Sequence, residues 1–257
     1  MALLQTAKQH FDDYISRASA LLEHAEGLEE SVLKDDILRA SYMMAAGSVD
    51  AYFCDAYADL VSRSVRAKEK YPAAEIGSKI GNLKLSVTTL LEAPEGGWRW
   101  RHAARDLVEK QSVLSIGEIK DLFNQFFPND RKLFTAATIG DWITHPDAKR
   151  RMFAIDSNAF KKLPKQKRAH AKDEARKRFN SLFDKHFQRR HDCIHNCDRP
   201  KQALANISSG QASKAIEDMQ FLIERCHEAL FNEFAMYLKR CGFDSITRNA
   251  VGAPALK

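Results

Sequence analysis

The residues best suited to chemistry lie near the end of a long basic segment, in the stretch RRHDCIHN at residues 189–196. Arg190 and His195 stand five positions apart there, and His191 directly follows the arginine. A guanidinium binds phosphate at any cellular pH, and an imidazole transfers protons near neutral pH. RNA carries its own nucleophile, the 2′-hydroxyl, so a nuclease built from these two groups needs no metal. The stretch predicts a phosphate-binding, proton-transferring site without a cofactor.

The spacing of the pair has a geometric consequence. On one ideal helix, five positions place Arg190 and His195 about 140° apart, which does not bring both side chains to one phosphate. A two-fold interface presents the same patch twice. We therefore expect a homodimer with one composite cleft, built from Arg190 and His195 of both subunits.

Other interpretations of the stretch stay open. His191, Cys193, His195 and Cys197 would share one face and suit zinc if the segment were extended. On a helix the histidines lie about 200° from the cysteines, so one ion cannot collect all four, and we expect no metal site. A Cys193 or Cys197 thiolate paired with His195 is a further nucleophile. Arg190 could also be a solvated cation near the last backbone carbonyls of the helix, and His195 could help to end that helix.

Positive charge is concentrated on one segment. Residues 149–190 hold 15 Lys or Arg against 4 Asp or Glu, although the whole chain has 40 basic and 34 acidic residues, so the remainder carries 25 basic against 30 acidic residues. A local basic surface favours phosphate-bearing partners. We expect Arg176, Lys177, Arg178 and Arg189 to contact RNA. The same residues would serve equally as the solvated face of an amphipathic helix.

Composition narrows the class of protein. A chain of 257 residues with 44% hydrophobic residues buries a substantial core, and its 11 glycines and 7 prolines cluster between apolar runs. No stretch approaches 18 apolar residues and the N-terminus does not read as a secretory signal, so we expect a soluble cytoplasmic protein with no membrane partner. Five cysteines favour reduced thiols. The phosphate and oxyanion loops of nucleotide kinases, dinucleotide enzymes and serine hydrolases are missing from the sequence.

Apolar periodicity predicts an all-α chain, a helical bundle with elaborations. Serine and glutamine at 208 and 211 have capping-box spacing, and Gly242 marks a stop. Residues 161–167, broken by Pro164, are expected to be a charged linker. Turns are expected at 94–97 and 128–130, and Pro200 disfavours helix at the residue before it. The expected helices cover residues 1–25, 31–70 (one helix or a bent pair), 76–92, 103–111, 116–127, 171–194 and 208–241.

Two segments together resemble the HEPN superfamily of helical domains. One is RRHDCIHN, an arginine, a polar residue, three further residues and a histidine at a late helix end; the other is AAGSVDAYFCDAYADLV at 45–61, an early core helix bearing an acid. The motif RRHDCIHN, followed by Asp198, is most similar to the HEPN group associated with ribonuclease L and related prokaryotic defence proteins. The resemblance covers a core of about 30–70 and 170–241 within a single domain, 1–257. Residues 72–165 have no counterpart and are expected to be a helical insertion.

The resemblance implies a metal-independent endoribonuclease that acts as a dimer and leaves 2′,3′-cyclic phosphate and 5′-hydroxyl ends. It makes Arg190 and His195 the catalytic pair and gives His191 the polar position beside the arginine. Asp50 would orient Arg190 by a charged hydrogen bond, with Asp55 as a nearby competitor.

Asn196 and Asp198 are flanking candidates only, Asn196 in a supporting position. The expected setting is antiviral defence or a toxin–antitoxin system. An inhibitor or sensor protein, or autoinhibition by residues 72–165, would then restrain the nuclease. Two alternatives remain: a non-catalytic helical module that binds nucleotide, RNA or a protein partner, and a nucleic-acid binder without chemistry.

Overall fold

The computed structural model describes residues 2–92, 98–109, 113–198 and 204–255, and within these ranges it contains helices and no strand, as the sequence predicted. The elements are α1 Gln5–Glu26, α2 Val32–Lys70, α3 Ser78–Gly81, α4 Val87–Glu92, α5 Trp98–Glu109, α6 Ile116–Phe123, the 3-10 turn η1 Asn124–Phe126, α7 Ala136–Ile143, α8 Arg150–Phe153, α9 Ser157–Lys162, α10 Lys165–Asn196, α11 Ser209–Arg240 and α12 Ser245–Ala250.

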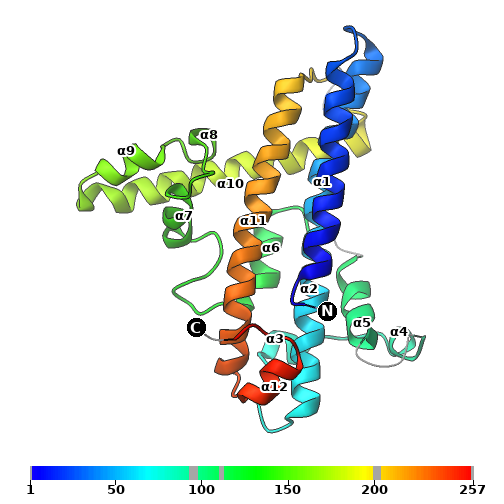
Figure 1. The fold of residues 1–257 in the computed structure, drawn as a ribbon, viewed down its shortest axis with the longest axis vertical. Coiled ribbons are helices and arrows are strands. Elements are labelled where there is room, and N and C mark those ends of the chain that lie inside the picture. The colour runs from blue at the N-terminus through cyan, green and yellow to red at the C-terminus, as the bar shows by residue number, and fades with distance from the viewer. Residues whose placement is uncertain (1, 93–97, 110–112, 199–203, 256–257) are drawn as a thin grey trace.

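Three long helices set the long axis of the molecule. Figure 1 shows α1, α2 and α11 running lengthwise, with α10 crossing them. The short helices α7, α8 and α9 lie at the N-terminal end of α10. On the opposite side of the molecule α5 lies beside α2, and α4 packs against α5. The crossing brings the C-terminal end of α10, with its arginine and histidines, to the same side as α5.

Helix α2 is the central element of the core. It is a single helix of 39 residues, which Ser31 begins by accepting a hydrogen bond from the Lys34 backbone N–H, so the alternative of a bent pair does not apply. From Tyr52 to Ser64 every residue is buried. This follows from its surroundings, because α1, α5, α10 and α11 all pack against it.

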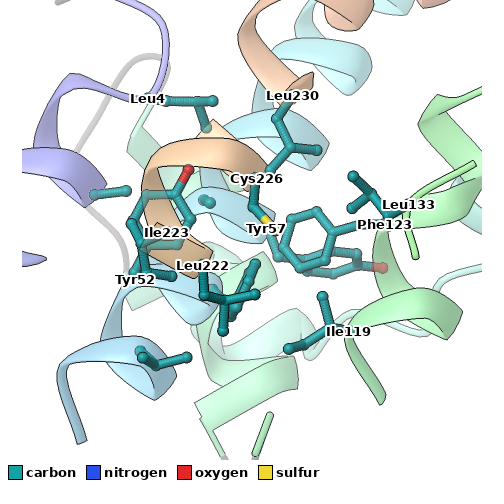
Figure 2. Packing of buried hydrophobic residues seen from close by; sticks show 14 of the residues in the cluster. Leu4, Tyr52, Tyr57, Ile119, Phe123, Leu133, Leu222, Ile223, Cys226 and Leu230 are labelled. Carbon is teal, nitrogen blue, oxygen red and sulfur yellow. The ribbon is translucent and has the colours of Figure 1, made fainter. Parts of the chain in front are cut away.

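The segment 72–165 shares this core. Phe123 of α6 lies with its ring centroid 5.3 Å from that of Phe53 and 5.9 Å from that of Tyr57, both on α2. Figure 2 shows Ile119, Phe123 and Leu133 gathered with side chains of α2 and α11. The segment is therefore integral to the hydrophobic core, and its deletion would remove core side chains as well as any inhibitory surface.

Helix α10 is longer than its periodicity predicted. The expected linker at 161–167 is wrong, because α9 continues to Lys162 and α10 begins at Lys165, directly after Pro164. Lysine, arginine, glutamine and alanine all have good helix propensity, so a high charge density does not interrupt the helix. Proline is also tolerated where a helix begins, since the first N–H groups have no partner within the helix.

The other boundaries follow the local signals to different degrees. The capping box of Ser208 and Gln211 is present, and Gly242 adopts a φ of +87° after α11, both as predicted. The expected turn at 128–130 is confirmed, whereas 94–97 and Pro200 lie outside the described residues. The helix expected at 76–92 is two short helices, α3 and α4, and the one expected at 116–127 ends at Phe123, whereas α5 begins earlier than expected, at Trp98. Helices α7, α8 and α9 were not predicted, since about two turns or fewer give too little periodicity to recognise.

Two buried polar clusters hold α10 across the bundle. His186 of α10 lies between Tyr42 of α2 and Asp218 of α11, with its Nδ1 2.7 Å from the tyrosine hydroxyl and its Nε2 3.0 Å from the carboxylate. Farther along, one oxygen of Asp198 accepts hydrogen bonds from Arg39 of α2 and Arg189 of α10, each at 3.0 Å. Buried charges are costly unless paired, so both clusters require α10 in this position.

No helix within the described residues has the length and apolar character needed to cross a membrane.

Asp198→Asn should destabilise the fold strongly. Asp198 is 1% exposed, and removing its charge takes the carboxylate from Arg189 and leaves Arg39 with only the more exposed Asp36 and Asp35. We expect the free energy of unfolding to fall by about 3 kcal/mol or more. Urea denaturation measures the change. The matched control is Asp12→Asn, which removes an exposed pair with Lys8 and should cost no more than about 0.5 kcal/mol; equal effects of the two variants would contradict the role given to Asp198.

Candidate active site

Arg190 lies between two pockets at the end of α10. The first, which we call the α5 pocket, has a volume of about 310 Å³, and the second, the α6 pocket, about 340 Å³. Besides Arg190, the α5 pocket is lined by Gly47, Asp50, Ala51, Cys54, Arg105 and Glu109, and the α6 pocket by Leu114, Ser115, Asp184, Phe187, Gln188 and His191. A guanidinium shared by two adjoining hollows is well placed to meet a phosphate whose flanking groups enter them.

Asp50 shares the α5 pocket with Arg190 but is bound elsewhere. Its Oδ1 accepts a hydrogen bond of 2.8 Å from the backbone N–H of Val113, in place of the expected bond from Arg190. Burial raises the pKa of the Asp50 carboxyl above its usual range, while the Val113 N–H and the positive charge of Arg190 oppose that rise. Among the described residues, the link between Asp50 and Arg190 is thus electrostatic and runs across a shared pocket.

Asp55 belongs to a different cluster. Its carboxylate is 1% exposed and receives Nδ1 of His10 at 2.8 Å and Nη2 of Arg101 at 3.4 Å, together with a close contact from Arg105. These partners lie on α1 and α5, so Asp55 fixes α1 and α5 against α2. Of the two acids considered for the site, Asp50 is the one that lies beside Arg190.

The two histidines nearest the C-terminal end of α10, His191 and His195, are adjacent and exposed. The ring centroids of His191 and His195 are 4.4 Å apart, and His191 lines the α6 pocket next to Arg190. His195 lines neither of the two pockets. Asn196 is exposed and donates to the Asp192 carboxylate at 3.3 Å, which places it at the helix end and outside both pockets. Within one chain, His191 therefore lies beside His195 and lines a pocket with Arg190, but Arg190 and His195 do not line the same pocket.

A polar track leads along α10 to this site. Asp184, Gln188, His191 and His195 follow the spacing of one helix face. A third, shallow hollow is lined by Lys177, Asn180, Ser181, Asp184, Lys185 and Gln188 and shares Asp184 and Gln188 with the α6 pocket. Sequence reasoning missed this face, although the spacing of four, three and four residues was available to identify it.

The three basic residues Arg176, Lys177 and Arg178 lie near the start of this track. Arg176 and Lys177 pair with Asp173, at 2.7 and 3.2 Å, and Arg178 donates to the backbone oxygen of Arg151 at 3.2 Å. Ion pairs on an exposed helix face are weak, so these side chains can exchange their partners for phosphate oxygens. Their interaction with RNA stays a prediction.

Arg189 differs from its neighbour Arg190. Its Nη2 donates to Asp198 at 3.0 Å and to the backbone oxygen of Asn206 at 2.9 Å, and its guanidinium lies 5.3 Å from the ring centroid of Tyr42. These contacts direct Nη2 and the guanidinium face of Arg189 towards Asp198 and Tyr42. The structure supports a role for Arg189 in holding the end of α10.

The alternative in which Cys193 is the nucleophile has little support from the local environment. Burial, followed by the negative charge of Asp198, raises the pKa of the Cys193 thiol to about 11. A thiol with such a pKa is almost fully protonated at neutral pH and is a poor nucleophile. Within the described ranges, no group of three or more His, Cys, Asp or Glu side chains is arranged to hold a metal ion.

Several lining residues come from the segment that the sequence left without a function. Arg105 and Glu109 of α5 line one pocket, and Leu114 and Ser115 line the other. Their sequence contains no motif that points to Arg190, and only the packing of α5 and α6 against α2 and α10 places them there.

Comparison of the chain with protein-family models, with curated proteins and with solved structures gave no match.

Replacing the two neighbouring arginines should give opposite results. Arg189→Ala leaves the buried Asp198 with one fewer partner, so we expect the free energy of unfolding to fall by about 3 kcal/mol. Arg190→Ala, by contrast, should change it by less than about 1 kcal/mol, because Arg190 faces two open pockets. Urea denaturation of both variants tests this. A larger loss for Arg190→Ala would show that the two roles are reversed.

Asp50→Asn should stabilise the protein at neutral pH. A carboxyl whose pKa is raised by folding favours the folded state most at pH values below its unfolded pKa, and that contribution is lost as pH rises through its folded pKa. The amide oxygen of asparagine can still accept from the Val113 N–H. We expect the variant to unfold at higher urea than the wild type at about pH 7, with the difference shrinking towards about pH 4. A difference that does not depend on pH would contradict this.

Proposed function

We propose that the protein is a metal-independent endoribonuclease of the HEPN type, in which Arg190 binds the scissile phosphate and His195 transfers a proton. The observation that carries the proposal is the position of Arg190 between two adjoining pockets, at the end of a polar track that runs from Lys177 to the exposed His191 and His195. An RNA strand needs such an arrangement, with a cation at one phosphate and space for nucleotides on both sides.

In the proposed reaction the 2′-oxygen attacks the adjacent phosphorus and the bond to the 5′-oxygen breaks. One imidazole accepts the proton of the 2′-hydroxyl, and a second donates a proton to the leaving 5′-oxygen. Arg190 stabilises the charge that gathers on the non-bridging oxygens. The products are a 2′,3′-cyclic phosphate and a 5′-hydroxyl, with no water consumed.

A homodimer supplies what one chain lacks. His195 does not line the pockets that hold Arg190, so we propose that a second copy, facing the first across a two-fold axis, completes the cleft. Exposure of the helix end supports this, since Ile194 is an apolar residue with 48% of its surface accessible. A role in antiviral defence or in a toxin–antitoxin system, restrained by an inhibitor or sensor protein, belongs to the same proposal.

The separation of Arg190 and His195 in one chain also favours a second candidate, a non-catalytic module that binds nucleotide, RNA or a protein partner. Such a module would use the same pockets and track for binding alone. The two candidates differ in whether the phosphodiester bond is cut.

Cleavage of total cellular RNA in the presence of EDTA decides between them. We expect cyclic phosphate ends from wild type. Activity should be lower by at least about a hundredfold for His195→Ala, which removes a proton transfer, and for Arg190→Ala, which removes the stabilisation of charge on the phosphate. His170→Ala is the matched control, since His170 is an exposed histidine on the same helix, far from the pockets, and it should cleave like wild type.

Equal activity of His195→Ala and His170→Ala would overturn the catalytic role. No cleavage by wild type, combined with RNA binding that weakens as salt rises, would favour the binding module.

A further inference from the structure

The α5 pocket combines features that suit one nucleobase. We propose that it binds a guanine base next to the scissile phosphate, so that the enzyme selects cleavage sites beside guanosine. This inference rests on the proposed function and adds its substrate preference. It concerns residues of α5, which belongs to the segment without a counterpart in the HEPN resemblance.

Space for a flat ring comes from small side chains on α2. Gly47, Ala51 and Cys54 follow one another at spacings of four and three residues and line the same pocket. A Cβ atom placed on Gly47 would meet nothing within 4 Å, so the glycine borders open space. Burial raises the pKa of the Cys54 thiol to about 12, so this wall carries no thiolate charge at neutral pH. The α2 side of the pocket is therefore small and uncharged apart from Asp50.

Two carboxylates and two guanidiniums surround this space. Asp50 uses Oδ1 for the Val113 N–H, and it lines the pocket. Glu109 lies one turn after Arg105 on α5, with its Oε2 4.0 Å from Nε of the arginine, and the Glu109 side chain is 66% exposed. Arg190 completes the lining. The pocket thus presents acceptors and donors together.

Guanine matches this mixture better than the other bases. Its O6 and N7 are adjacent acceptors that a guanidinium binds in a bidentate manner. Its Watson–Crick edge carries N1–H and N2–H donors, which a carboxylate accepts. Adenine presents an amino donor beside N7, so it offers a guanidinium only one acceptor. Asp50 or Glu109 would accept from N1–H and N2–H. Arg105, through the donors other than the Nη1 that contacts Asp55, would donate to O6 and N7, which leaves Arg190 for the phosphate.

Titration calorimetry of the full-length wild-type protein with guanosine, adenosine, cytidine and uridine 5′-monophosphates tests the proposal without requiring cleavage. We expect the guanosine nucleotide to bind at least about tenfold more tightly than the other three. Equal affinities, or no heat with any nucleotide at millimolar concentration, would overturn it.

Variants at Gly47 show whether the α5 pocket is the site. Gly47→Leu fills the space on an uninterrupted helix and should abolish guanosine nucleotide binding. Gly47→Ala is the matched control, because it adds one methyl group and should keep at least half of the affinity. Both replace a mid-helix glycine with a better helix former, so both should fold. Unchanged binding by Gly47→Leu would place the nucleotide elsewhere and overturn the proposal.

Failure of this inference is distinguishable from failure of the proposed function. Guanosine nucleotide binding that Gly47→Leu removes, in a protein that cuts no RNA, would support the pocket and refute the nuclease. RNA cleavage at sites with no excess of guanosine would support the nuclease and refute the guanine pocket.

Discussion

A single buried carboxylate oxygen holds the structure around the candidate site in place. Asp198 accepts from Arg39 and Arg189 at the point where α10 ends, and both Cys197 and Asp198 adopt left-handed backbone conformations there, with φ of 49° and 56°. Residues other than glycine adopt this conformation at a cost of about 1–2 kcal/mol each. The two charged hydrogen bonds offset that strain, and they fix the last turn of α10, which carries Arg190 and His195, against α2.

The same pairing explains why two neighbouring arginines have different roles. Successive residues on a helix point about 100° apart, so when Arg189 faces Asp198 and Tyr42, Arg190 must face away from them. It then points to the side of α2 that carries Asp50 and Gly47, where α5 and the residues before α6 close the space from the other side. The interior contacts of one arginine thereby determine the exposure of the other.

The segment between α2 and α10 serves both stability and the candidate site. Its phenylalanines enter the core beside α2, and α5 brings Arg105 and Glu109 to the pocket that Arg190 shares with Asp50. A segment that is anchored in the core positions its polar side chains more rigidly than a surface loop would. In the proposed nuclease this segment would supply the substrate preference, while residues of α10 would supply the phosphate binding and the proton transfer.

The sequence by itself determined the helical class, the long core helix α2, the caps of α11 and the exposed histidine-bearing end of α10, because periodicity and capping are local properties of the chain. It also singled out Arg190, His191 and Asp50, which the fold brings to adjoining pockets. Only the tertiary structure decided that Arg189 pairs with Asp198, that Asp50 bonds to Val113, and that Arg105 and Glu109 reach the site. Those outcomes depend on contacts between residues far apart in the chain, and no local spacing encodes them.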